Sequence, residues 1–152
     1  MNTIFSPLLY DIKEQTMVSY NILLIEDDEI ERIKFRRVCQ KNGASHKIVE
    51  ASNGEKALEL LQNKDELPNI ILLDLNMPKM NGLEFLKTLK KDDALKYVPI
   101  FVLSTSNNYK DIKDCYSLGV CGYLIKPLHF EVYKEKIACF LNYLTCNEFV
   151  FD

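Results

Sequence analysis

The stretch from Ile70 to Gly82 reads IILLDLNMPKMNG, an apolar run that stops at a carboxylate and continues into turn residues. Four consecutive apolar side chains without polar alternation are typical of a strand covered on both faces, as in a parallel α/β sheet. Asp74 follows this run directly, and Pro78 and Gly82 interrupt the chain before helical spacing begins. The stretch therefore predicts a buried strand that ends in an acidic group at the edge of a sheet.

Short apolar runs of this kind alternate with longer amphipathic segments along most of the chain. The runs predict strands near residues 22–25, 46–51, 70–73, 100–103 and 123–125. Helical periodicity predicts helices near residues 30–41, 54–61, 83–89, 109–118 and 130–144. Because alternating strands and helices build a parallel sheet with helices on its faces, we expect an α/β fold of five βα units.

Length and charge restrict the class of protein. The chain has 152 residues, of which 47% are hydrophobic and 27% charged, so one domain is expected. Its 19 basic and 22 acidic residues give a net charge of −3, which provides no overall basic footprint for nucleic acid or an anionic membrane. The basic residues between 32 and 41 follow Glu29 and Glu31 and are interpreted as a solvated helix face. They are Arg32, Lys34, Arg36, Arg37 and Lys41.

The cysteines and the apolar runs bear on cellular location. The five cysteines, at positions 39, 115, 121, 139 and 146, never form a C-x-x-C pair. This pattern favours free thiols in a reducing compartment over a disulfide framework or a zinc site. No apolar run approaches the roughly 18 residues of a membrane-spanning helix, and no basic segment precedes an apolar stretch at the N-terminus. We therefore expect a cytoplasmic protein.

Polar side chains follow the predicted strands at the sheet edge where open parallel sheets bind ligands. Glu26 and Asp27 follow the first strand, Asp74 the third, Ser104 the fourth and Lys126 the fifth. Grouped carboxylates repel one another unless a cation compensates, and Mg²⁺ combines one or two carboxylates with water and phosphate oxygens. The group predicts phosphate chemistry, in which Asp74 attacks a phosphoryl group and Lys126 offsets its charge.

Four motifs together resemble the receiver domain of two-component response regulators, most simply the single-domain chemotaxis type. They are ILLIEDDE at 22–29, IILLDLNMPKMNG at 70–82, PIFVLSTS at 99–106 and GYLIKP at 122–127. The resemblance covers about residues 21–144 and implies a doubly wound, flavodoxin-like (βα)5 sheet with strand order 2-1-3-4-5. The LSTS stretch with Tyr116 is also similar to small receivers found beside phytochrome-type kinases.

The resemblance implies three segments. We expect an N-terminal extension at residues 1–19, in which Ser6 and Pro7 begin a short helix. A receiver domain follows at residues 20–146, and a C-terminal tail occupies residues 147–152. No output domain is expected after the last helix.

The resemblance also implies a role for each residue at the predicted strand ends. Asp74 is the phosphoacceptor, Lys126 binds the phosphoryl group, Ser104 is the switch hydroxyl and Tyr123 is the switch aromatic residue. The Lys126–Pro127 peptide bond is expected to be cis, which would aim the ammonium into the site.

Mg²⁺ is the cofactor that the resemblance implies. Asp27 and Asp74 are expected as direct ligands, Asn76 supplies its backbone carbonyl, and Glu26 acts through a water molecule. Asp28 is then mainly a helix-start residue, because acids cap the free N–H groups of a helix.

The implied function is a phosphorylation switch whose only chemistry is its own Mg²⁺-dependent phosphorylation and autodephosphorylation. A sensor histidine kinase or a histidine phosphotransfer protein supplies the phosphoryl group. The reporting face combines the fourth predicted helix (109–118), the fifth strand (123–125) and the fifth helix (130–144). We expect this face to bind a downstream protein or a second copy of the chain as a homodimer. Neither nucleic acid nor a membrane is an expected partner.

Three other functions fit the sequence less well. A phospho-aspartyl phosphatase of the haloacid-dehalogenase type needs a second acid two residues after the nucleophile, where this chain has Asn76. A flavodoxin-like nucleotide binder offers glycines and backbone N–H groups after the first strand, where this chain has carboxylates. A receiver-shaped module that is never phosphorylated is not favoured, because the acceptor, lysine, hydroxyl and acidic pair are all present.

Overall fold

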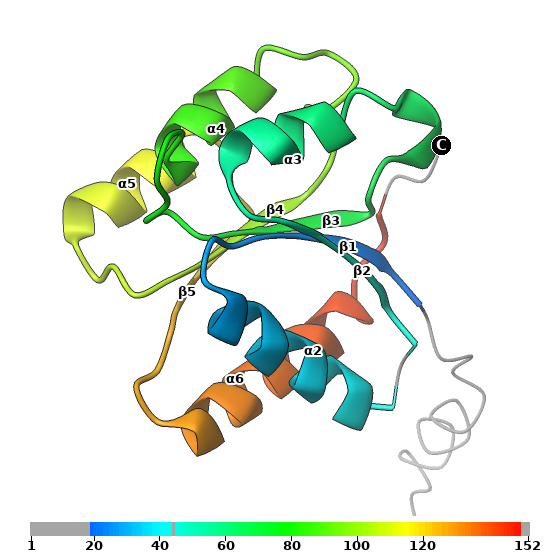
Figure 1. Cartoon of the computed structure of the whole chain (residues 1–152), viewed down its shortest axis with the longest axis vertical. Helices are drawn as coiled ribbons and strands as arrows, with labels where there is room; N and C mark the ends of the chain where they lie inside the picture. Colours follow the sequence, from blue (N-terminus) through cyan, green and yellow to red (C-terminus); the bar gives the residue numbers. More distant parts are fainter. Residues whose placement is uncertain (1–18, 44, 150–152) are drawn as a thin grey trace, which may run out of the picture.

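A five-stranded parallel sheet forms the middle layer of the computed structural model, which describes residues 19–43 and 45–149 (Figure 1). The strands are β1 (Asn21–Ile25), β2 (Lys47–Ala51), β3 (Ile70–Leu73), β4 (Ile100–Ser104) and β5 (Gly122–Ile125). Their order is β2-β1-β3-β4-β5, and every neighbouring pair is parallel. The predicted α/β class and strand order are therefore confirmed.

Helices cover both faces of the sheet, α3, α4 and α5 on one side and α2 and α6 on the other (Figure 1). Their bounds are α2 (Glu29–Lys41), α3 (Gly54–Leu60), α4 (Gly82–Leu89), α5 (Tyr109–Ser117) and α6 (Phe130–Leu144). A short 3₁₀ helix, η1 (Lys64–Glu66), was not predicted; the Asn63 side chain caps it by accepting from the Asp65 N–H at 3.2 Å. The helix predicted near Ser6 lies outside the described residues, as do residues 150–152.

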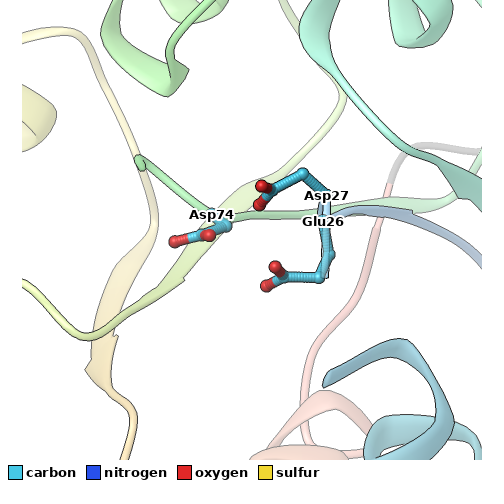
Figure 2. A group of neighbouring side chains, drawn as sticks. All are labelled: Glu26, Asp27 and Asp74. Atoms are coloured by element: carbon cyan, nitrogen blue, oxygen red, sulfur yellow. The ribbon is translucent and has the colours of Figure 1, made fainter. Parts of the chain in front are cut away.

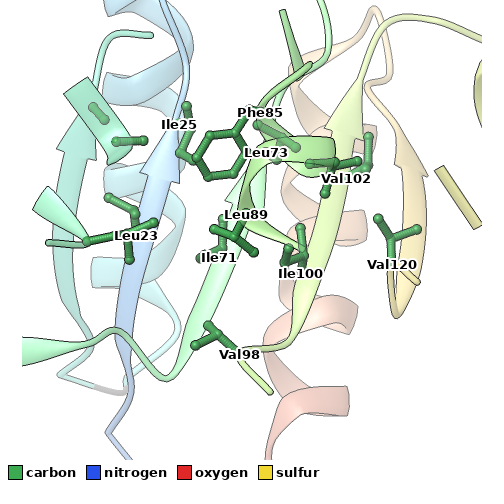
Figure 3. Packing of buried hydrophobic residues seen from close by; sticks show 14 of the residues in the cluster. Leu23, Ile25, Ile71, Leu73, Phe85, Leu89, Val98, Ile100, Val102 and Val120 are labelled. Carbon is green, nitrogen blue, oxygen red and sulfur yellow. The ribbon is translucent and has the colours of Figure 1, made fainter. Parts of the chain in front are cut away.

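The apolar strands are buried because successive side chains enter two different cores. In β1, Leu23 and Ile25 pack towards α3 and α4, while Ile22 and Leu24 pack towards α2 and α6. β3 divides its side chains in the same way, and each of its four residues is fully buried. Figure 3 shows the first of these cores, in which Phe85 and Leu89 of α4 lie against β1, β3 and β4. A strand with two buried faces needs apolar residues throughout, which explains the missing polar alternation.

Side-chain caps begin the helices that follow β1, β2, β3 and β4, close to one edge of the sheet. Asp28, Asn53, Asn81 and Asn108 each accept a hydrogen bond from a backbone N–H in the first turn of the helix that follows. At α4 the Glu84 side chain also accepts from the Asn81 N–H, which completes a capping box. These caps keep the connections after β1 and β2 short, so polar residues that follow the strands stay near the sheet edge.

Gly82 allows the start of α4 to pack directly on the loop that carries Asp74. A Cβ at this position would lie 2.7 Å from the Asp74 carbonyl oxygen and 2.8 Å from the Leu75 Cα. The Gly82 N–H donates to the Leu75 carbonyl at 3.0 Å. Backbone atoms cannot yield to such an overlap as a flexible side chain can. The close approach therefore couples α4 to the acidic end of β3.

We predict that Gly82→Ala lowers the free energy of unfolding by about 1–3 kcal/mol, because the new methyl group overpacks backbone. Gly54→Ala is the matched control, since Gly54 also begins an Asn-capped helix and the three atoms nearest to its Cβ would all belong to the flexible Met80 side chain. Urea denaturation followed by circular dichroism measures both variants. Equal losses in the two would contradict the role assigned to the Gly82 contact.

Candidate functional site

Strand register brings the polar residues of distant segments to one edge of the sheet. Ile25 pairs with Leu73 at the ends of β1 and β3, so the residues that follow, Glu26 and Asp74, come together. Ser104 pairs with Ile125, which places Lys126 just beyond the end of β4. The Lys126 N–H also donates to the Ser104 carbonyl at 2.8 Å.

Three carboxylates form the centre of this site. Glu26, Asp27 and Asp74 each place a carboxylate oxygen within 4.8 Å of the other two. Figure 2 shows the three side chains gathered where β1 and β3 end. Glu26 and Asp74 are buried, with 3% and 6% exposure, whereas Asp27 is exposed. The site is thus an acidic group with one side open to solvent.

Lys126 is the cation that faces these carboxylates. Its side chain is 7% exposed, and its Nζ lies 2.5 Å from Glu26 Oε2, 3.7 Å from Asp74 Oδ2 and 3.8 Å from Glu31 Oε2. Only the Glu26 contact is a hydrogen bond. One ammonium therefore serves three carboxylates, and Asp27 adds a fourth negative group to the site.

The electrostatic balance of the site favours a further cation. Burial raises the pKa of Glu26 to about 7, even though Lys126 lowers it. Burial likewise raises the pKa of Asp74, and the opposing charge of Lys126 does not cancel this effect. Burial disfavours the Lys126 ammonium, but Asp74 and Glu26 outweigh that cost and raise its pKa. Even with Lys126 beside them, the two buried carboxylates have raised pKa values, and a further cation would favour their charged forms.

The donor set fits a hard divalent cation. Mg²⁺ and similar ions prefer carboxylate and carbonyl oxygens and retain some of their waters, which suits a site with two buried carboxylates and one exposed one. The described residues that would hold such an ion are Glu26, Asp27 and Asp74. Asn76 is exposed beside them, and its N–H donates to Asp74 Oδ1 at 3.4 Å.

The Lys126–Pro127 peptide bond is trans, as is every other peptide bond among the described residues. The expectation of a cis bond was therefore wrong. The trans form of an X–Pro bond is intrinsically favoured by roughly 0.5–1 kcal/mol. Here the trans form already directs the ammonium to Glu26 and Asp74, so the site does not require the cis geometry in this state.

Ser104 and Tyr123 both contact Ser106 in the loop after β4. Ser104 is fully buried, and its hydroxyl oxygen accepts a hydrogen bond from the Ser106 N–H at 3.2 Å. The half-buried Tyr123 donates its hydroxyl to the Ser106 carbonyl at 2.8 Å. Burial raises the pKa of Tyr123, so its phenol stays a donor at neutral pH. A change at Ser104 can therefore reach Tyr123 through one loop residue.

Arg32 and Glu31 are residues of the site that sequence reasoning missed. The Arg32 guanidinium donates to the backbone carbonyls of Glu26 at 2.8 Å and Asp27 at 3.0 Å, and it forms an ion pair with Glu50 of β2 at 3.5 Å. Its side chain is only 17% exposed, so the interpretation as a solvated helix face was wrong for this residue. The spacing of residues along α2 could not predict these contacts, because the partners of Arg32 lie in the loop after β1 and on β2.

Asp28 has the role expected at a helix start. It is the N-cap of α2, and its Oδ1 accepts a hydrogen bond from the Ile30 N–H at 2.8 Å. Its own N–H donates to Glu26 Oε1 at 3.1 Å, which helps to hold that carboxylate. Asp28 thus supports the acidic group through its backbone.

The chain matches the family model of the response regulator receiver domain over residues 22–138. Among curated proteins, the probable methanogenesis regulatory protein FilR2 of Methanothrix harundinacea is 36% identical over 120 residues, which cover 76% of this chain and 77% of that protein. Response regulator Rcp1 of Synechocystis sp. is 37% identical over 115 residues, which cover 72% and 78% of the two chains.

Solved structures of response regulators share the fold. The phosphorylated cyanobacterial phytochrome response regulator RcpA aligns with a TM-score of 0.83 and 28% identity, covering 88% of this chain and all of that one. The Mn²⁺-bound form of response regulator Rcp1 aligns with a TM-score of 0.80 and 29% identity, covering 88% and 99%. Among the described residues, no helix combines the length and apolar character needed to cross a membrane.

We predict that Mg²⁺ or Mn²⁺ stabilises the protein against urea, by about 2.7 kcal/mol at a cation concentration one hundred times the dissociation constant. Asp27→Asn should remove most of this gain, because it takes a charged ligand from the open side of the acidic group. Asp28→Asn is the control, since it removes the same charge one residue away and Asn is an equally good N-cap. A cation effect that survives in Asp27→Asn would refute this site.

Proposed function

The chain belongs to the response regulator receiver domain family, and on that premise we propose that it accepts a phosphoryl group on Asp74. The donor is a sensor histidine kinase or a histidine phosphotransfer protein. The observation that carries this proposal is the position of Asp74, a buried carboxylate at the end of β3 beside an acidic pair and one lysine. The receiver domain is proposed to span residues 20–146 in the cytoplasm.

Mg²⁺ is the proposed cofactor. Asp27 and Asp74 would bind it directly, with the backbone carbonyl of Asn76 and, through water, Glu26. When bound, the ion offsets the charge that develops on the phosphoryl oxygens. The three carboxylates that lie within 4.8 Å of one another, two of them buried, support this assignment.

Asp74, Lys126 and Ser104 have different roles in the proposed phosphoryl transfer. An Asp74 carboxylate oxygen forms a bond to phosphorus while the bond from phosphorus to the histidine nitrogen of the donor breaks, and the electron pair leaves with that nitrogen. Lys126 keeps its proton, since its pKa is raised, and its ammonium binds the transferred phosphoryl oxygens. Ser104 donates its hydroxyl to the product. No substrate other than the phosphoryl donor is turned over, apart from the water that hydrolyses the product.

The proposed output surface is formed by α5, β5 and α6. Phosphorylation adds about −1.5 to −2 charges near Ser104, and the Ser106 contacts described above connect that hydroxyl to Tyr123 on β5. Large apolar side chains are exposed on these elements and the loop between them, which supports binding of a downstream protein or a second copy of the chain. They are Tyr109, Tyr116, Ile125, Leu128, Phe130, Val132 and Tyr143.

We predict that acetyl phosphate with Mg²⁺ adds the mass of one phosphoryl group to the wild-type protein, measured by intact mass spectrometry. Asp74→Asn should gain none, because an amide nitrogen does not replace the carboxylate as nucleophile. Asp28→Asn, which removes a neighbouring charge and keeps its cap, should be labelled like the wild type. A wild type that gains no base-labile phosphate, or an Asp74→Asn variant that gains it equally, would overturn the proposal.

We also predict that beryllofluoride, an analogue of the phosphoryl group, changes amide hydrogen exchange at residues 104–109 and 122–125. These segments contain the hydrogen bonds that connect Ser104 to Tyr123. Helix α3, which packs over β2 and β1 and has neither β4 nor β5 among its main contacts, serves as the internal reference. Identical exchange with and without beryllofluoride in both segments would remove the case for this output surface.

A further inference from the structure

The Lys126 ammonium lies within ion-pair range of three carboxylates, those of Glu26, Asp74 and Glu31. It carries three N–H donors, and Glu26 takes one of them in a hydrogen bond of 2.5 Å. Asp74 Oδ2 and Glu31 Oε2 lie at nearly equal distances from Nζ, 3.7 Å and 3.8 Å, which is within ion-pair range and beyond hydrogen-bond length. A small displacement of Nζ therefore decides whether the ammonium approaches Asp74, the residue proposed as phosphoacceptor, or Glu31.

Glu31 is held in place from its outer side. Its Oε1 accepts a hydrogen bond from Lys34 Nζ at 2.8 Å, and that ammonium also lies 4.6 Å from the centre of the Tyr133 ring. Its Oε2 is buried and accepts no hydrogen bond within the described part of the chain. The oxygen nearest to Lys126 is therefore an acceptor without a donor, and a shift of the ammonium would supply one.

We propose that Glu31 is a positioning residue for Lys126 that competes with the phosphoryl group for its ammonium. This inference rests on the proposed phosphorylation of Asp74. In the unmodified protein Glu31 and Glu26 share the ammonium. A phosphoryl group carries more negative charge than a carboxylate, so Lys126 turns to it and gives up its ion pair with Glu31. Glu31 thereby disfavours the phosphorylated state.

A simpler role for Glu31 must be separated from this one. Glu31 and Glu29 are the two acids in the first turn of α2, where negative charge stabilises a helix. Glu29 is exposed, and within the described residues the ion pairs of Lys126 are with Glu26, Glu31 and Asp74, not with Glu29. Glu29→Gln therefore removes the same charge from the same turn without touching the lysine.

The test compares beryllofluoride binding to the wild type, Glu31→Gln and Glu29→Gln at saturating Mg²⁺, by titration with ¹⁹F NMR detection. Loss of the competing carboxylate should make Glu31→Gln bind roughly fivefold more tightly, the size expected for one partly buried ion pair. Glu29→Gln should stay within about twofold of the wild type, since exposed charges are screened by solvent and salt. Urea denaturation establishes that both variants are folded.

A spectroscopic readout reports the ammonium itself. In protein with ¹³C-labelled lysine, the Lys126 Hε–Cε resonance should shift in unliganded Glu31→Gln and not in Glu29→Gln. With beryllofluoride bound, the wild-type and Glu31→Gln resonances should converge, because the ammonium has left Glu31 in both. A residue that only supports the fold would not produce this pattern.

The failure of this inference differs from the failure of the proposed function. If the wild type binds beryllofluoride but Glu31→Gln binds it equally or more weakly, the positioning role is wrong and phosphorylation of Asp74 stands. Equal tightening in Glu29→Gln would assign the effect to general charge and would also overturn the role. A wild type that does not bind beryllofluoride with Mg²⁺ would refute the proposed function and this inference together.

Discussion

The buried ion pair between Lys126 and Glu26 is the contact on which the site depends. It joins residues one hundred positions apart, at the ends of β1 and β5, which are separated by β3 and β4 in the sheet. Removing two charges from water is costly, and only good geometry with further polar contacts recovers that cost. Here Asp74 and Glu31 lie within ion-pair range of the same ammonium, and the Asp28 N–H donates to Glu26. The fold therefore assembles the charges as one group, and none of them would be stable there alone.

The acidic group at the ends of β1 and β3 is supported from both sides of the sheet. On the α2 side, Arg32 binds the carbonyls of Glu26 and Asp27 and is itself oriented by Glu50 on β2. On the α4 side, Gly82 packs against the backbone of Asp74 and Leu75. Rigid backbone on both sides limits the positions that the carboxylates can adopt. Groups fixed before a reaction need little reorganisation during it, which is the general basis of electrostatic stabilisation in a transition state.

Sequence reasoning predicted the parts of the site that follow from strand ends. Apolar runs locate the strands, and parallel strands bring their following residues to one edge, so Glu26, Asp74 and Lys126 could be grouped without a structure. Arg32 could not be grouped with them, because its partners are backbone carbonyls and a carboxylate on another strand. Glu31 was equally hidden, since it looks like any charged residue of an amphipathic helix. The isomer of the Lys126–Pro127 bond depends on a small energy difference that local sequence does not determine.

The complete burial of β3 has a consequence for how such a protein diversifies. Every side chain of this strand contacts one core or the other, and Asp74 is the next residue of the chain. Changes in this strand, which positions the proposed phosphoacceptor, would disturb the interior, whereas the outer faces of the helices can vary at little cost to folding. The residues that position the proposed reaction thus lie in the interior, whereas those that would select a partner lie on the outer faces of the helices. A lineage built on this plan can acquire new partners by surface drift alone while its reaction stays the same.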